Sequence, residues 1–226
     1  MLLEFIPNLL KGASLSLIVA LLSLLFSSIF GLLFALMSLS KNKVISIFAK
    51  FYVVIVRGIP DLVLMLLIFY GGQMLVNELT DFLEWDYINV SSFAAGVFTL
   101  SFIFTAFMSE TFRGAIIAVD KGQMEAAYCY GFSRKKIIIT ILIPQMMLHA
   151  LPSYTNNWLV LLKATALLSI IGLHDLIYIS ASASSSTHQP FVFYFVASLF
   201  YLLITWISTK LLDYLRAYYH LDKNIA

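Results

Sequence analysis

Charged residues are scarce in this sequence. Only 12% of the 226 residues are charged, whereas 61% are hydrophobic and the mean hydropathy is +0.93. A soluble domain usually carries about twice that share of charge. A surface with so few charges cannot face water on all sides. The composition therefore excludes an ordinary soluble protein and indicates a single membrane domain over residues 1–226.

Side chains suited to metal binding or intramembrane catalysis are also few. The single cysteine, Cys129, excludes an intrachain disulfide, and the four histidines are scattered rather than clustered at metal-ligand spacing. An intramembrane protease would need a Ser/His pair, paired aspartates or a His-Glu-x-x-His motif, and only Asp61 is a clear acid within an apolar run. We therefore expect no metal site, no catalytic residues and no nucleic-acid partner.

Long apolar runs dominate the sequence instead. The run 13–39 contains no charge, exceeds the roughly 20 residues that cross a bilayer, and is too long for the core of a signal peptide. Similar runs predict an all-α polytopic protein with five spans, at residues 13–39, 51–76, 93–112, 137–173 and 191–212. The motif Arg57-Gly58-Ile59-Pro60 breaks the second predicted span, prolines interrupt the fourth, and the Ser-rich segment 180–190 is predicted as a loop.

The distribution of basic residues predicts the orientation, because Lys and Arg concentrate on the cytoplasmic side of a membrane protein. If the N-terminus is outside, Lys11 is the only one of the basic loop residues on the outer side. The acidic loop 78–86 also lies there. The C-terminus then lies in the cytoplasm. The other basic loop residues fall inside: Lys41, Lys43, Lys50, Arg113, Lys121, Arg134, Lys135, Lys136, Lys210, Arg216 and Lys223.

The longest polar stretch, residues 113–136, contains a short helical pattern. Ala126 and Ala127 favour helix, Gly131 can end one, and Ser133 suits the N-cap of the next helix. A short helix with the exposed carboxylate of Glu125 and a small-residue face suits docking into a groove on a partner. The alternative is a solvated loop between two spans.

Several motifs together resemble the permeases of bacterial ABC importers. Glu125-Ala126-Ala127, Gly131 and Ile143-Pro144 match the spacing of the cytoplasmic coupling loop, although the family has Leu where Ile143 stands. The segments 57–64, 110–123 and 151–167 resemble the polar amino-acid branch, above all the permeases for histidine, arginine, lysine and ornithine. The resemblance implies the five-helix type I importer permease fold over residues 11–212, with the coupling loop at about 118–137.

This resemblance also implies partners and a function. The chain would be the permease subunit of an ATP-driven amino-acid uptake system in the bacterial plasma (inner) membrane. It would pair with an identical or a sister permease, with two copies of an ATP-binding subunit inside and a solute-binding protein outside. No phosphate-binding loop of the form Gly-x-x-x-x-Gly-Lys-[Ser/Thr] exists here, so ATP and Mg²⁺ are expected on the partner subunit and no cofactor on this chain. Glu125, Ala126, Ala127 and Gly131 would couple the permease to the ATPase.

Asp61 is the main acidic candidate for the substrate path. It follows the break at Gly58, and broken backbone within a membrane is tolerated where it lines a cavity. A carboxylate there suits a cationic side chain such as arginine. The alternative is an internal ion pair with Arg57 or Lys163. If the acid has no substrate role, glutamine or another polar amino acid becomes the alternative substrate, and a channel is a more distant alternative.

Polar residues of the fourth predicted span are further candidates for the substrate path. Asn156 and Asn157 near the start of its second half, with Lys163 and Thr165, could meet the carboxylate and amino groups common to all amino acids. Many family members have Asp at the position of Ala164, so this chain lacks a carboxylate that those permeases have. The alternative for the Asn pair is helix capping and hydrogen bonding between helices. Glu110 and Arg113, three residues apart, are expected to form a local ion pair.

Overall fold

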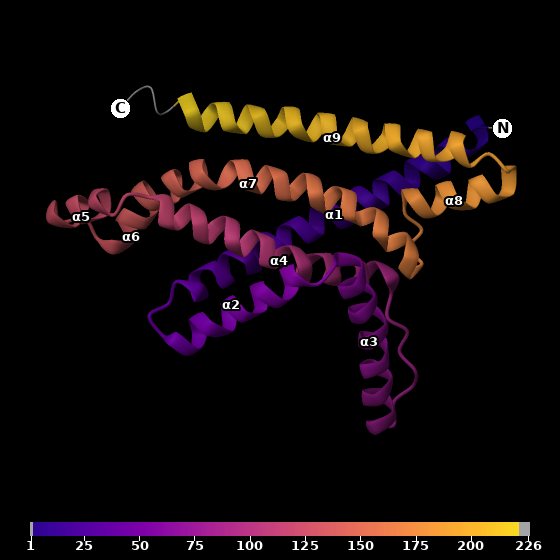
Figure 1. Ribbon diagram of the computed structural model, residues 1–226, viewed down its shortest axis with the longest axis horizontal. Coiled ribbons are helices and arrows are strands. Elements are labelled where there is room, and N and C mark those ends of the chain that lie inside the picture. Colours follow the sequence, from indigo (N-terminus) through magenta and orange to yellow (C-terminus); the bar gives the residue numbers. More distant parts are fainter. Residues whose placement is uncertain (1, 222–226) are drawn as a thin grey trace.

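The computed structural model describes residues 2–221, and helices connected by short loops make up this range (Figure 1). In chain order the helices are α1 (Leu2–Ser38), α2 (Lys43–Gly58), α3 (Asp61–Phe82), α4 (Ser92–Ala118), α5 (Lys121–Cys129), α6 (Arg134–Ile137), a π-helical turn (Ile138–Leu142), α7 (Ile143–Ala164), a 3-10 helix (Thr165–Ile171), α8 (Leu176–Thr187) and α9 (Pro190–Leu221).

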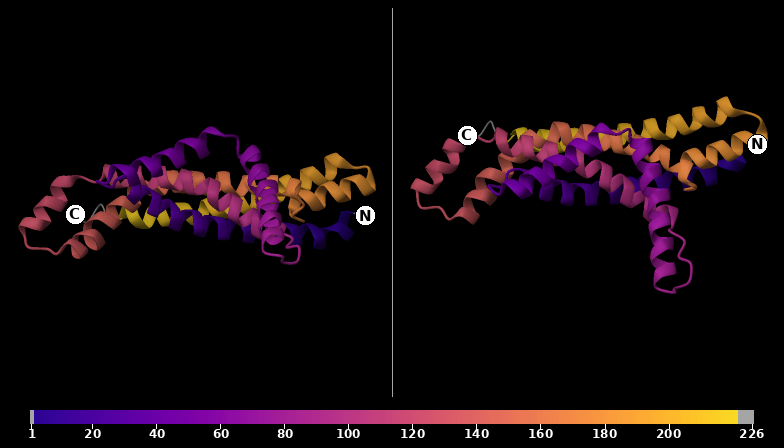
Figure 2. Two further views of the ribbon diagram at one scale, coloured as in Figure 1. Left: turned by 90° about the horizontal axis from the view of Figure 1, so that it is seen from below. Right: turned by 60° about the horizontal axis from the view of Figure 1, so that its bottom comes forward.

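The helices form an elongated bundle. Helices α1, α4, α7 and α9 run along the long axis, α5 and α6 lie at one end, and α8 lies with the start of α1 at the other (Figures 1 and 2). Helix α3 projects crosswise from the side of the bundle, as Figure 1 and the right view of Figure 2 show. Within the described residues, five helical segments are long and apolar enough to cross a membrane: 4–38, 61–82, 92–118, 134–171 and 190–214. The predicted all-α protein with five spans is confirmed.

The packing of α1 against α4 forms the centre of the bundle. Small side chains on α1 are buried, and Ser23 Oγ donates to the Val97 carbonyl of α4 at 3.4 Å. Gly31 allows the closest approach, because a Cβ atom there would lie 2.5 Å from Cβ of Met108. In membrane helices such small residues permit close contact between backbones. This contact holds α4 in the middle of the bundle, where it also packs against α2, α3 and α7.

The second predicted span, 51–76, is wrong in its position. The chain forms two helices that meet at Ile59-Pro60, and the membrane-length segment is α3, at 61–82. Helix α2 is amphipathic and buries Ser46, Ala49, Val53 and Val56 at helical spacing. Because hydropathy does not distinguish a helix that lies on the bundle from one that leaves it, the apolar run was read as one span. Glu78 and Asp81 consequently lie in the last turn of α3, not in a loop.

The fourth predicted span is interrupted by changes of helix type. A π-helical turn separates α6 from α7, and a 3-10 helix follows α7. Pro144 directly follows the π-helical turn and Pro152 lies within α7, and neither can donate a backbone N–H to the preceding turn. Asn156 and Asn157 lie within α7, after Pro152.

The Ser-rich segment 180–190 is mostly helix, so the predicted loop is wrong. Helix α8 runs to Thr187, and its hydroxyl groups donate to carbonyls one turn back: Ser180 Oγ to Leu176 O at 2.7 Å and Ser185 Oγ to Ala181 O at 3.0 Å. Such bonds keep the serine hydroxyl from competing with the helix backbone. The small side chains let α8 pack against α1 and α9.

Several helices extend past the apolar runs that predicted them. Helix α1 begins at Leu2 rather than at residue 13, with Asn8 and Lys11 exposed while Leu9 and Ala13 are buried. Helix α4 continues to Ala118 and α9 to Leu221. Hydropathy shows only the part of a helix that lies in lipid, and the polar turns beyond it were missed. Lys223, assigned to the cytoplasmic side, lies outside the described residues.

Candidate functional site

The predicted coupling loop forms a helix, a turn and a second helix. Asp120 caps α5 by accepting a hydrogen bond from the Gly122 N–H at 2.8 Å. Gly131 has φ +78°, a left-handed conformation that glycine adopts without strain, and it reverses the chain after α5. Ser133 Oγ accepts from the Lys136 N–H at 3.4 Å and caps α6. The local structure expected from these residues is confirmed.

The surface that α5 offers differs from the predicted one. Glu125 and Ala126 are exposed, but Ala127 is only 5% exposed and faces the interior of the loop. The Phe132 N–H donates to the Ala127 carbonyl at 3.1 Å, and the Gln145 side chain on α7 donates to that of Gln123. Ala127 therefore packs against the following turn and presents little of its own surface, and its role in coupling stays a prediction. Burial within a loop is not visible in the sequence.

Aromatic side chains at the same end were not predicted as part of the site. Tyr128 is 51% exposed and Tyr130 is 84% exposed. The Lys136 ammonium lies 4.4 Å from the centre of the Phe132 ring. Exposed aromatic residues beside a short docking helix are typical of contact surfaces. The signal was present in the sequence, since three aromatic residues lie within the five residues 128–132.

A polar cavity that opens to the surface of this chain is lined by residues of α2, α4 and α7. It has a volume of about 590 Å³, and its lining residues include Arg57, Glu110, Thr111, Asn156 and Asn157. A second cavity of about 390 Å³ shares Arg57 and Glu110 and adds Lys50 and Arg113. Polar groups within membrane-spanning helices mark pathways for ions and substrates. The two cavities together form the candidate translocation site.

Two of the charged side chains in this site already form an ion pair with each other. Arg113 donates to Glu110 through Nε at 2.9 Å and Nη2 at 2.7 Å, which confirms the predicted local ion pair. The guanidinium carbon of Arg57 lies 5.4 Å from the centre of the Phe107 ring. The Arg57 side chain is exposed and forms no ion pair among the described residues. It is free to receive an anionic group.

The two asparagines have different environments. Asn157 Nδ2 donates to Thr111 Oγ1 at 3.0 Å, which joins α7 to α4. This contact confirms the interhelical alternative for Asn157. Asn156 is exposed and lines the cavity without a hydrogen bond among the described side chains. Asn156 therefore remains available to a substrate, whereas Asn157 positions the wall on which it lies.

The remaining candidates for the substrate path do not line this cavity. Asp61 begins α3, half-buried, and forms no salt bridge with Arg57 or Lys163 in the part of the chain described. Gly58 ends α2 with open space around it, and the Lys163 side chain is exposed. Thr165 is fully buried, and its hydroxyl donates to the Leu162 carbonyl at 2.7 Å. The sequence alone does not show that these residues lie away from the cavity. For Asp61 the reason is the bend at Pro60, which directs α3 away from the bundle.

A buried acid at the opposite end of the bundle was missed. Asp175 is fully buried, and its Oδ1 accepts from the Tyr178 N–H at 2.8 Å, which caps α8. Burial raises the pKa of Asp175 to about 7. Its backbone lies against Gly12 of α1, and the Leu176 N–H donates to Ser16 Oγ at 3.3 Å. An aspartate immediately before a helical pattern is an N-cap signal that could have identified it.

Comparison with known proteins gives a consistent result. Residues 23–220 match the family model described as "binding-protein-dependent transport system inner membrane component". The chain is 45% identical over 212 residues to the histidine/lysine/arginine/ornithine transport system permease protein HisQ of Salmonella typhimurium, covering 94% of this chain and 93% of that protein. It is 40% identical to the arginine ABC transporter permease protein ArtQ of Haemophilus influenzae, covering 91% and 90%.

Solved structures share the fold. The chain superposes on one chain of a crystal structure of an amino acid ABC transporter with histidines, with a TM-score of 0.81, 31% identity and 96% of both chains covered. It also matches an inward-facing MetNI methionine ABC transporter with a TM-score of 0.75 at 15% identity, covering 96% of this chain and 98% of the other. The second likeness shows the fold alone.

Proposed function

The chain belongs to the family of binding-protein-dependent transport system inner membrane components, and we propose that it is the permease subunit of an ATP-driven importer of basic amino acids. The observation that carries this proposal is 45% identity, over nearly the whole of both chains, to a permease of a histidine, lysine, arginine and ornithine transport system. The polar cavity lined by α2, α4 and α7 offers a polar contact surface for such a substrate.

The cavity offers groups that suit an amino acid. The free guanidinium of Arg57 and the side-chain amide of Asn156 can bind the carboxylate common to all amino acids. Asp61, which does not line this cavity, contributes negative charge at the start of α3 for a cationic side chain. Its lack of an internal ion pair among the described residues supports this role over the structural alternative.

The proposed assembly distributes the work among several subunits. This chain is a pore subunit and not an enzyme, and two ATP-binding subunits with their Mg²⁺ hydrolyse ATP in the cytoplasm. Helix α5 and the turn after it dock on one of them. An identical or sister permease completes the path, and a solute-binding protein delivers the amino acid from outside.

The orientation proposed for this multi-pass membrane protein places α5 and the C-terminus in the cytoplasm of a bacterium and the N-terminus outside the plasma (inner) membrane. The separation of basic from acidic loops supports it. In intact cells an impermeant thiol reagent should leave the exposed native Cys129 unlabelled. It should label Asp86→Cys in a Cys129→Ser background, since Asp86 is exposed in the loop after α3. The reverse labelling pattern would contradict the orientation.

Uptake by reconstituted complexes tests the proposed substrate. Wild-type complexes should take up labelled arginine and histidine in an ATP-dependent way. The Asp61→Asn variant should lose arginine uptake by at least about tenfold and keep glutamine uptake if any is present. Losing one partner of a buried charged pair costs on the order of 3–5 kcal/mol, and less where water enters.

The control for this experiment lies on the same helix. Asp81→Asn removes the same charge at the other end of α3, where the side chain is exposed, and should leave arginine uptake unchanged. Equal loss of arginine, histidine and glutamine uptake in Asp61→Asn would support a structural role for this residue. Failure of the wild-type complex to transport arginine would reject the proposed substrate.

A further inference from the structure

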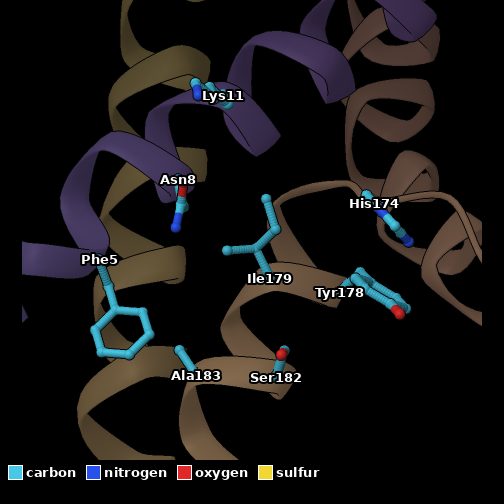
Figure 3. A pocket seen from close by; sticks show the side chains of 8 residues that line it. All are labelled: Phe5, Asn8, Lys11, His174, Tyr178, Ile179, Ser182 and Ala183. Atoms are coloured by element: carbon cyan, nitrogen blue, oxygen red, sulfur yellow. The ribbon is translucent and has the colours of Figure 1, made fainter.

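A separate pocket lies at the outer end of the bundle, away from the two cavities of the translocation site. It has a volume of about 220 Å³, and side chains of α1 face those of α8 across it (Figure 3). Phe5, Ile179 and Ala183 form its apolar part. Its polar part consists of Asn8, Lys11, His174, Tyr178 and Ser182.

The walls of this pocket are held in place by close packing. A Cβ atom on Gly12 would lie 2.9 Å from the Asp175 carbonyl oxygen and 2.8 Å from Cδ1 of Ile179. Helix α1 therefore contacts the start of α8 directly beside the pocket. The buried Asp175 caps α8, and the ring of His174 stacks on that of Tyr178 with 4.4 Å between their centres. A site on rigid helices can receive a group without first being ordered.

The charge of the pocket is of one sign. Lys11 is exposed and forms no ion pair within the described part of the chain. The residues that line the pocket include no carboxylate, and Asp175 beneath it is fully buried. In the orientation proposed above, Lys11 is the basic residue that lies on the outer side of the membrane. The pocket therefore suits a carboxylate with some apolar surface beside it.

The volume of the pocket favours a single amino-acid side chain over a larger small molecule as its occupant. Pockets for drug-sized molecules usually have about 300–1,000 Å³, so this one is suited to a single side chain. The family name specifies a binding protein as partner, and the proposed function places that protein outside. We propose that the solute-binding protein docks on the outer end of α1 and α8 and places an acidic side chain in this pocket beside Lys11. This inference rests on the proposed function.

ATP hydrolysis by the reconstituted complex, stimulated by the solute-binding protein loaded with arginine, tests the docking site. The Lys11→Gln variant should raise the half-saturating concentration of the binding protein about fivefold at low salt. The difference should shrink at high salt, because an exposed charge acts mainly on association and is screened. Maximal stimulated activity and basal ATP hydrolysis should stay unchanged. Asn8→Asp, which puts a carboxylate in the pocket, should act in the same direction.

Two controls make the result specific. Lys11→Arg keeps the charge and should behave as the wild type. Gln189→Glu lowers the net charge by one unit, as Lys11→Gln does, at an exposed position of the same end that does not line the pocket. An unchanged half-saturating concentration in Lys11→Gln, or the same increase in Gln189→Glu, would overturn the docking site while leaving the proposed function intact. A wild-type complex that no arginine-loaded binding protein stimulates would contradict both.

Discussion

Replacing Gly31 with alanine is expected to destabilise the folded chain strongly. The added methyl carbon would lie 2.5 Å from Cβ of Met108 and 3.1 Å from the backbone of Met108 and Ser109. Helix α1 would have to move away from α4 along their main contact. Overpacking usually costs about 1–3 kcal/mol and more where backbone is in the way, which for a chain of this length corresponds to a melting temperature roughly 2–12 °C lower. Thermal unfolding of the detergent-purified chain measures this change.

Gly114 provides the matched control, since a Cβ atom there has no neighbour within 4 Å. It lies on α4, the helix that Gly31 contacts. In an exposed helix, alanine is favoured over glycine by about 1 kcal/mol, so Gly114→Ala should leave the melting temperature unchanged or raise it. Equal melting temperatures for Gly31→Ala and the wild type would show that α1 and α4 do not pack as described.

Replacing Ala126 with tryptophan is expected to lower amino-acid uptake more than tenfold without unfolding the permease. Ala126 is exposed on α5, so a larger side chain has room in the isolated chain. In the proposed assembly, the larger side chain would clash with the surface of the ATP-binding subunit on which α5 docks. Losing about 1.4 kcal/mol of docking energy lowers the affinity tenfold. Uptake, together with co-purification of the ATP-binding subunit, measures the effect.

Two further variants separate docking from folding. Val44→Trp adds bulk at the exposed start of α2, outside the coupling loop, and should leave uptake unchanged. Ala127→Trp should lower both uptake and the melting temperature, because Ala127 is buried between α5 and the following turn. Normal uptake and normal co-purification in Ala126→Trp would contradict the docking of α5.

Hydropathy and turn chemistry account for the features that were predicted correctly. A bilayer demands about 20 apolar residues for each crossing, so the number of spans follows from composition along the chain. The turn after α5 follows from Gly131 and Ser133, whose conformational and hydrogen-bonding preferences act within a few residues. The ion pair between Glu110 and Arg113 is equally local. Each of these features depends on neighbours in the sequence.

Long-range packing accounts for the features that were missed. Ser-rich residues 180–187 are helical because Asp175 caps them and α1 and α9 pack against their small side chains. Ala127 and Thr165 are buried, although their neighbours Glu125 and Lys163 are exposed. Which side of a short helix faces inward depends on helices more distant in the chain.

The sequence by itself determined that this protein crosses a membrane five times, that the chain bends at Pro60, and that a short helix and turn lie in the polar stretch before α7. Apolar length, a missing backbone N–H and a left-handed glycine each impose their constraint locally. Only the tertiary structure decided that Arg57, Glu110 and Asn156 share one cavity, that Asp61 does not line it, and that Lys11 and His174 line one pocket where α1 lies against α8. These groups come from helices far apart in the chain, and close packing between helices brings them together.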